Sequence, residues 1–143
     1  MQQKVIVRVM RHFEATREQV FDAWLDPDTA RKFLFASPDG HMVRADIEPF
    51  VGGTFRITDH RGNEDVDHVG TYIEISRPRR LVFSLSLPKL KAVSTRVTID
   101  LTVQDRGCEV ALTHDGVPAN FAGQMEESWN QILYVLAHTL FYG

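Results

Sequence analysis

The sequence has one cysteine, Cys108, among 143 residues. A single cysteine excludes an intrachain disulfide and every zinc or redox site that needs a CxxC pair. This usage is typical of a protein in a reducing compartment. The N-terminal stretch also lacks the charged and apolar regions of a secretory signal peptide. The sequence therefore predicts a cytoplasmic location.

Long hydrophobic runs and blocks of one charge are missing too. No apolar stretch approaches the roughly 20 residues of a membrane-spanning helix. The formal net charge is −3, with both signs mixed along the chain, so neither a nucleic-acid surface nor a basic membrane-binding patch is indicated. The signatures GxSxG, GxGxxG, HExxH and the Walker loop are absent from the sequence. We expect no cofactor and no metal.

The composition that remains is that of an ordinary globular protein, with 43% hydrophobic and 24% charged residues. The length predicts a single domain over residues 1–143. A compact chain of this size buries roughly 70% of the surface that its unfolded form exposes. It therefore needs neither a metal nor a disulfide to fold.

Apolar residues recur at helical spacing in some segments of the chain and alternate with polar residues, as in strands, in others. A capping box from Thr16 to Gln19 and a helix start at Asp26-Pro27 predict two short helices. Apolar residues recur at helical spacing over 121–140, which corresponds to about 30 Å of helix. Alternation of apolar and polar residues predicts seven strands joined by short turns. These strands cover 5–13, 43–47, 55–57, 69–75, 81–87, 97–103 and 108–114.

The element order predicts an α+β fold. A seven-stranded curved antiparallel sheet would wrap around the long C-terminal helix, with two short helices after the first strand. A strongly twisted sheet cannot contact one helix along its whole length. We therefore expect a ligand-sized cavity between the sheet and the helix.

Five short motifs occur in a fixed order along nearly the whole chain. They are VFDAWLDP at 20–27, GGTF at 52–55, GTYIEI at 70–75, PRRLVF at 78–83 and LTH at 112–114. Together they resemble the helix-grip fold of the START-like, Bet v 1-like (SRPBCC) superfamily. Within it they resemble the branch named for homology to activators of the heat-shock-protein-90 ATPase.

The resemblance implies a fold and a cavity, and no single activity. Members of the superfamily are similar to lipid carriers, polyketide cyclases, hormone receptors and co-chaperone modules, and fold alone does not choose among these. Two positions depart from the branch pattern. Phe33 replaces a usual tryptophan, and Ser128 replaces the glycine that usually precedes Trp129. We expect Phe33 to keep the aromatic packing and Ser128 to narrow the cavity.

The expected cavity lining consists of apolar and aromatic residues on inward positions of the strands and helices, together with one histidine. The same side chains would form a plain core without a guest, and the pattern alone favours that interpretation. Phe35, beside the short helices, is a candidate gate. The full set is Phe33, Phe35, Phe55, Phe83, Leu85, Leu101, Leu112, His114, Met125 and Trp129.

His114 is the one candidate for catalysis. It lies on the buried parity of the last strand, just before the loop to the final helix. A buried imidazole with a shifted pKa could act as an acid or base, or contact a ligand. The alternative is a histidine that is hydrogen-bonded within the core.

One arginine and one group of polar residues are interpreted as structural. Arg11, on the apolar parity of the first strand, is expected to be a strand-end arginine, with a charge at the cavity rim as the alternative. The group lies around one hairpin and consists of residue types that bind metal ions. A hairpin tip does not hold such side chains in a fixed geometry, so we expect an exposed charged hairpin. Its members are Asp59, His60, Glu64, Asp65, Asp67 and His68.

Three functions remain open. The favoured one is a binding domain, monomeric or homodimeric, that encloses a small hydrophobic or aromatic ligand in the cavity. The first alternative is a polyketide cyclase-like or hydrolase-like enzyme that uses the same cavity with His114 as acid or base. The second is a protein-interaction module of the co-chaperone kind.

Overall fold

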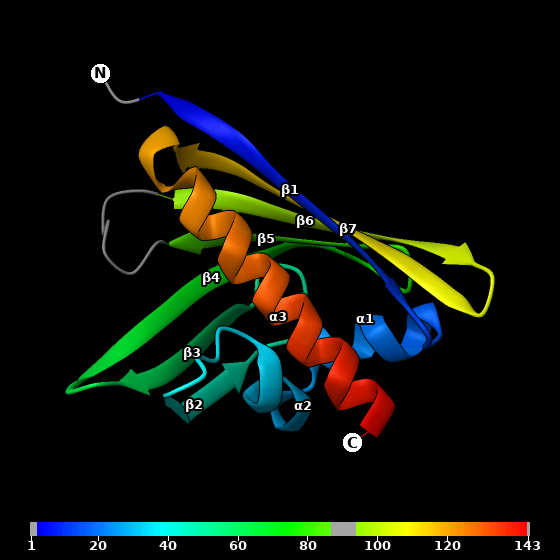
Figure 1. Ribbon diagram of the computed structural model, residues 1–143, viewed down its shortest axis with the longest axis horizontal. Helices are drawn as coiled ribbons and strands as arrows, with labels where there is room; N and C mark the ends of the chain where they lie inside the picture. The colour runs from blue at the N-terminus through cyan, green and yellow to red at the C-terminus, as the bar shows by residue number, and fades with distance from the viewer. Residues whose placement is uncertain (1–2, 87–93, 143) are drawn as a thin grey trace.

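A computed structural model describes residues 3–86 and 94–142. The predicted element order is confirmed, with α3 as the long C-terminal helix and the short turn η1 before it (Figure 1). The elements are β1 (Lys4–Phe13), α1 (Arg17–Leu25), α2 (Pro27–Phe33), β2 (His41–Ile47), β3 (Thr54–Arg61), β4 (Glu64–Ser76), β5 (Arg80–Ser86), β6 (Ser94–Gln104), β7 (Gly107–Pro118), η1 (Ala119–Phe121) and α3 (Ala122–Tyr142).

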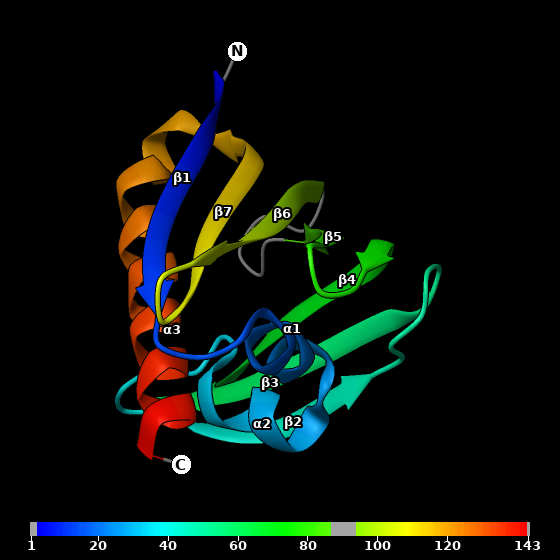
Figure 2. The same ribbon diagram turned by 90° about the vertical axis from the view of Figure 1, so that its right-hand side faces the viewer.

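The strands of the described residues form one antiparallel sheet in the order β1-β7-β6-β5-β4-β3-β2. The sheet is strongly curved, as predicted. Figure 2 shows α3 against β1 and β7, while the sheet curves away from it toward β4, β3 and β2. The helices α1 and α2 lie near the C-terminal end of α3. One long helix thus crosses a sheet that does not follow it along its whole length.

Both predicted helix starts are confirmed. Thr16 Oγ1 accepts a hydrogen bond from the Gln19 amide at 3.1 Å, and Gln19 Oε1 accepts one from the Thr16 amide at 2.9 Å. At the second start, Asp26 Oδ2 accepts from the Thr29 amide at 3.2 Å. These bonds satisfy amides that have no partner inside the helix. They fix where the chain leaves β1 and enters the helical segment.

Most strands bury the inward parity that the alternation predicts, but β4 buries Tyr72 and His68 and exposes Val69 and Ile73. On β7, Cys108, Val110, Leu112 and His114 are all buried. Phe33 is also fully buried, and its ring meets that of Trp24 edge-on with 5.2 Å between the centroids. Aromatic packing at this position is therefore kept. Leu87, which the alternation includes in the fifth strand, lies outside the described residues.

The prediction of an exposed charged hairpin is wrong for two of its members. β3 and β4 extend to a two-residue turn, so the alternation continues further than the apolar residues indicate. Asp59 shares the inward parity of Phe55 and Ile57, and His68 faces Ile57 from β4. Asp59 is 0% exposed and His68 is 8% exposed. The curved sheet thus carries two polar side chains inward.

Gly70 on β4 allows a close contact inside the sheet. It is paired with Phe55 on β3. A Cβ atom at this position would overlap the carbonyl oxygen of Ser84 and lie 2.6 Å from two atoms of the Phe55 ring. The missing side chain therefore lets the Phe55 ring lie across β4.

We predict that Gly70→Ala lowers the free energy of unfolding by about 2 kcal/mol, because the packed sheet must shift to admit the methyl group. Chemical denaturation measures this loss. Gly123→Ala is the matched control, because a Cβ atom there meets nothing within 4 Å and the residue lies in α3. In a helix this change is neutral or stabilising. Equal stability of Gly70→Ala and the wild type would contradict the described contact.

Candidate functional site

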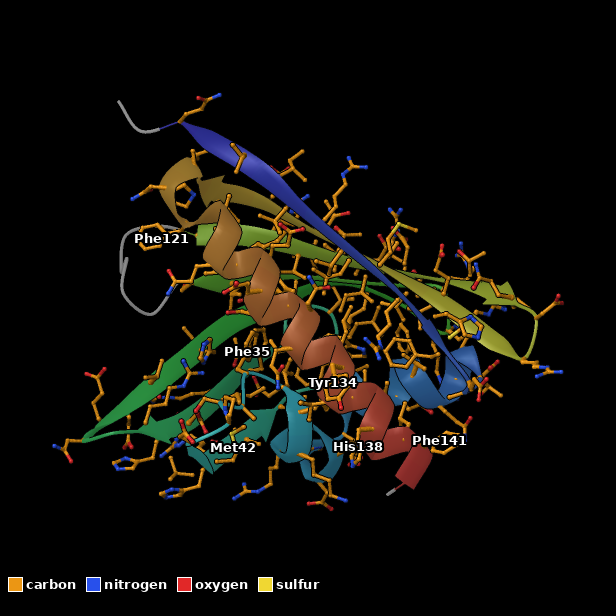
Figure 3. All side chains as sticks on the ribbon, viewed as in Figure 1. Phe35, Met42, Phe121, Tyr134, His138 and Phe141 are labelled. Carbon is orange, nitrogen blue, oxygen red and sulfur yellow. The ribbon has the colours of Figure 1, made fainter. Side chains whose placement is uncertain are left out.

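A groove of about 830 Å³ opens between α3, the segment after α2 and the strands β3 to β5. Its volume lies within the range of about 300–1,000 Å³ found for small-molecule sites. Figure 3 labels Phe121 and Phe35 on the same side of α3, to its left in that view. The apolar part of the lining is formed by Phe35, Pro38, Val66, Leu85, Phe121, Met125, Trp129 and Ile132.

The structure brings four of the ten predicted contact residues to this groove: Phe35, Leu85, Met125 and Trp129. Ser128, the departure from the branch pattern, also lies on its wall. The other six are buried in the core and are no part of the groove lining. They are Phe33, Phe55, Phe83, Leu101, Leu112 and His114.

Trp129 connects the groove to the core. Its ring lies edge-on to Phe35, with 5.7 Å between the centroids, and tilted against Trp24 at 6.4 Å. Its indole Nε1–H donates a hydrogen bond to His114 Nδ1 at 3.0 Å. Trp129 therefore forms one face of the groove, and its contacts in the core fix the orientation of its ring.

His114 continues this hydrogen-bond chain into the sheet. An indole N–H can only donate, so His114 Nδ1 accepts. The neutral ring then donates from Nε2 to Thr95 Oγ1 at 2.6 Å, and the Thr95 hydroxyl donates to the Leu85 carbonyl at 2.8 Å. Burial lowers the pKa of His114 to about 4. His114 is a neutral core histidine that holds Trp129, and it does not line the groove.

Asp59 organises the polar end of the groove. Its Oδ2 accepts hydrogen bonds from the Ser37 amide at 3.2 Å, the Ser37 hydroxyl at 2.8 Å and Arg61 Nε at 2.8 Å. Its Oδ1 is buried and has no hydrogen-bond partner within the described residues. Ser37 and Arg61 line the groove, whereas Asp59 lies behind them. The carboxylate thus ties the segment after α2 to β3.

Phe35 is held in a conformation that bulky residues rarely adopt. Its φ is +58°, in the left-handed region, where a non-glycine residue costs on the order of 1–3 kcal/mol. Two contacts hold it there. Arg61 Nη2 donates to the Phe35 carbonyl at 2.8 Å, and the Phe35 ring stacks flat on His68 at 4.2 Å. The Phe35 ring is therefore fixed as part of the groove wall.

His68 and Arg61 are the site residues that the sequence interpretation missed. Burial, together with the nearby charge of Arg61, lowers the pKa of His68 to about 4. The Nδ1 atom of His68 is buried and has no hydrogen-bond partner within the described residues. The available signal was the strand parity, which places Asp59 and Arg61 on the same face as Phe55 and Ile57.

A second hollow of about 510 Å³ lies near the C-terminal part of α3, beside the end of β1. Four of its ten lining residues are charged or histidine: Arg11, His12, Glu14 and His138. The Arg11 guanidinium lies 5.4 Å from the centre of the Tyr134 ring, so Arg11 is at a cavity rim, although at this smaller hollow. The larger and more apolar groove is the better candidate for a ligand site.

Within residues 3–86 and 94–142, no three histidine, cysteine, aspartate or glutamate side chains are grouped so that they could hold a metal ion. None of the helices in the described part of the chain has the length and apolar character needed to cross a membrane.

Comparison with known proteins relates the chain to one family. The model of the family described as "Activator of Hsp90 ATPase homolog 1-like protein" matches residues 14–140. None of the curated proteins compared with the chain matches it. The match covers both short helices, most of the sheet and nearly all of α3.

Solved structures agree in fold. The AHSA1-like protein from Aeromonas hydrophila is 25% identical, with 95% of this chain and 92% of that chain covered and a TM-score of 0.83. A protein from Rhodobacter sphaeroides is also 25% identical, with coverages of 96% and 97% and a TM-score of 0.81. A protein of unknown function from Staphylococcus aureus is 13% identical, with coverages of 96% and 94% and a TM-score of 0.85, and it supports the fold alone.

The buried state of His114 predicts a loss of stability in acid. Its pKa is about 4 in the folded protein and 6.5 in an unfolded chain. Between these values the unfolded chain binds a proton that the folded protein does not, so acidification favours unfolding. From about pH 7 to about pH 5, His114 alone should remove about 2 kcal/mol of unfolding free energy.

Urea unfolding at several pH values tests this, with His114→Gln as the comparison. Glutamine can hydrogen-bond but does not titrate. Over this pH range the unfolding free energy of His114→Gln should therefore fall by about 2 kcal/mol less than that of the wild type. Parallel pH curves for the two proteins would contradict a neutral, buried His114.

Proposed function

We propose that this chain, which belongs to the Activator of Hsp90 ATPase homolog 1-like family, binds a small hydrophobic or aromatic molecule in the groove beside α3. The groove itself supports this proposal. It combines a volume of about 830 Å³, a wall rich in apolar and aromatic side chains, and polar groups contributed by the segment after α2, by β3 and β4, and by α3. That combination is typical of small-molecule sites.

The groove wall is prepared for such a guest. Trp129 is fixed by its hydrogen bond to His114, and Phe35 is fixed by Arg61 and His68. A wall that is already ordered loses little conformational entropy when a ligand arrives. Burying about 200 Å² of apolar ligand surface would contribute about 5 kcal/mol before the losses of association. That gross figure corresponds to a dissociation constant of about 0.2 mM, which the losses of association weaken, so binding of a two-ring compound in the millimolar range is expected.

The two alternatives lack an observation of their own. An acid–base reaction by His114 would need a ring nitrogen facing the groove, but both nitrogens are engaged with Trp129 and Thr95. A co-chaperone role would rest on the description of the family alone. We therefore propose ligand binding as the function.

The test uses N-phenyl-1-naphthylamine, a neutral compound whose fluorescence rises when it leaves water. We expect saturable binding to the wild-type protein. Ser128→Phe should weaken it at least about tenfold, or about 1.4 kcal/mol, because the phenyl ring would occupy the groove. A thermal shift provides the second readout, since a ligand of the folded state raises Tm.

Glu126→Phe is the matched control. It adds the same side chain to α3 at an exposed position outside the groove lining, and it should bind the probe as the wild type does. The proposal fails if the probe does not bind, or if both variants lose affinity equally.

A further inference from the structure

We infer that the preferred ligand carries an acidic oxygen group, a carboxylate or a sulfonate, and that this group binds beside Arg61 and His68 while the apolar body lies along Phe35 and Trp129. This inference rests on the proposed function and deepens it. It assigns a polar end to a groove whose other lining residues are mainly apolar.

Arg61 presents oriented hydrogen-bond donors to the groove. Its Nε and Nη2 atoms are held by Asp59 Oδ2 and the Phe35 carbonyl, both at 2.8 Å. A guanidinium has five N–H donors in one plane. The two bonds to Asp59 and Phe35 therefore fix the plane of the Arg61 guanidinium and leave its remaining N–H donors available to a ligand. Its side chain is 38% exposed and lines the groove. A planar, fixed fork of this kind matches the oxygens of a carboxylate.

His68 adds a buried polar atom that lacks a partner. More than nine-tenths of the residue is buried, and it lines the groove, yet Nδ1 has no hydrogen-bond partner within the described residues. A neutral imidazole carries a proton on either nitrogen, so Nδ1 can donate to an acceptor. The His68 ring also lies near the Ile57 backbone carbonyl, and an oxygen of the ligand would supply a partner for Nδ1.

The surrounding charges favour an anion over a cation at this end. Asp59 lies behind the lining; three donors surround its Oδ2, while its buried Oδ1 has no partner within the described residues. At this end of the groove the donors come from Arg61 and His68, and the polar side chains Gln124, Ser128, Asn130 and Gln131 that line it from α3 are uncharged. The acidic residue of the lining, Glu127, is exposed on α3. A cationic ligand would meet the guanidinium without a facing carboxylate.

The polar end directly adjoins the aromatic wall. The Phe35 ring is stacked on His68 at 4.2 Å and lies edge-on to Trp129 at 5.7 Å. One ligand can therefore contact both with a spacing of a few bonds between its acidic group and its ring. An aromatic or polyunsaturated acid has this shape.

The experiment compares two probes with the same body. 8-Anilino-1-naphthalenesulfonate differs from N-phenyl-1-naphthylamine by its sulfonate, so the ratio of their affinities isolates the acidic group. We expect the wild-type protein to bind the sulfonate at least about tenfold more tightly, the equivalent of one strong interaction. Titrations at two salt concentrations should show a weaker preference at higher salt.

Two variants locate the effect. Arg61→Lys keeps the charge beside Asp59 and loses the planar fork. His68→Phe keeps a ring that can stack on Phe35 and removes Nδ1. Each should lower the affinity ratio at least about threefold. Arg80→Lys is the matched control, because Arg80 pairs with Asp100 at 2.7 Å outside the groove, and its ratio should equal that of the wild type.

The outcomes separate the two proposals. If the neutral probe binds in the groove but the sulfonate gives no gain, or if Arg61→Lys and His68→Phe both leave the ratio unchanged, the inference is overturned and the proposed function stands. If neither probe binds, both are overturned. Near-ultraviolet circular dichroism of each variant confirms that the packed fold is retained.

Discussion

The hydrogen bond from Trp129 to His114 is the interaction on which the site depends. It joins α3 to β7, and through Thr95 and the Leu85 carbonyl it continues into β6 and β5. Each donor of these three hydrogen bonds has one acceptor, so the buried polar atoms of Trp129, His114 and Thr95 are satisfied without water. Because the chain fixes the indole ring, the groove has a wall before any ligand arrives. In the proposed function, a histidine in the core would contribute to binding by holding another side chain, without touching the guest.

Much of the fold could be predicted from the sequence because its signals are local. Alternation, the capping box at Thr16 and the Asp26-Pro27 start each act within a few residues, and β7 shows the inward set that its parity predicts. The position of the groove depends instead on where α3 lies over the curved sheet. α3 lies against β1, and the open space lies beside β3 to β5. Phe55, Phe83 and the other inward residues of the sheet pack as core.

The polar end escaped prediction for a different reason. Charged residues around a turn are usually solvated, and this expectation outweighed the strand alternation at Asp59. At His68 the alternation itself was misleading, because the apolar residues Val69 and Ile73 lie on the outer face of β4. The structure shows that curvature carries both inward, where Asp59 is satisfied on one oxygen by Ser37 and Arg61. A buried carboxylate that ties two segments together favours one arrangement of the loop over others, at a cost in desolvation. The strained Phe35 backbone is held by the same network. The polar groups and the aromatic wall are thus parts of one assembly.

The central claim is that the groove beside α3, and not the hollow near the end of β1, receives a small apolar molecule. Isotope-filtered nuclear Overhauser spectroscopy tests this most directly, with ¹³C-labelled protein and unlabelled N-phenyl-1-naphthylamine. The account predicts contacts from the probe to the methyl groups of Met125, Leu85 and Ile132, which line the groove. Contacts to Leu140 and Ala137, which line the other hollow, or no contacts at saturating probe, would contradict it.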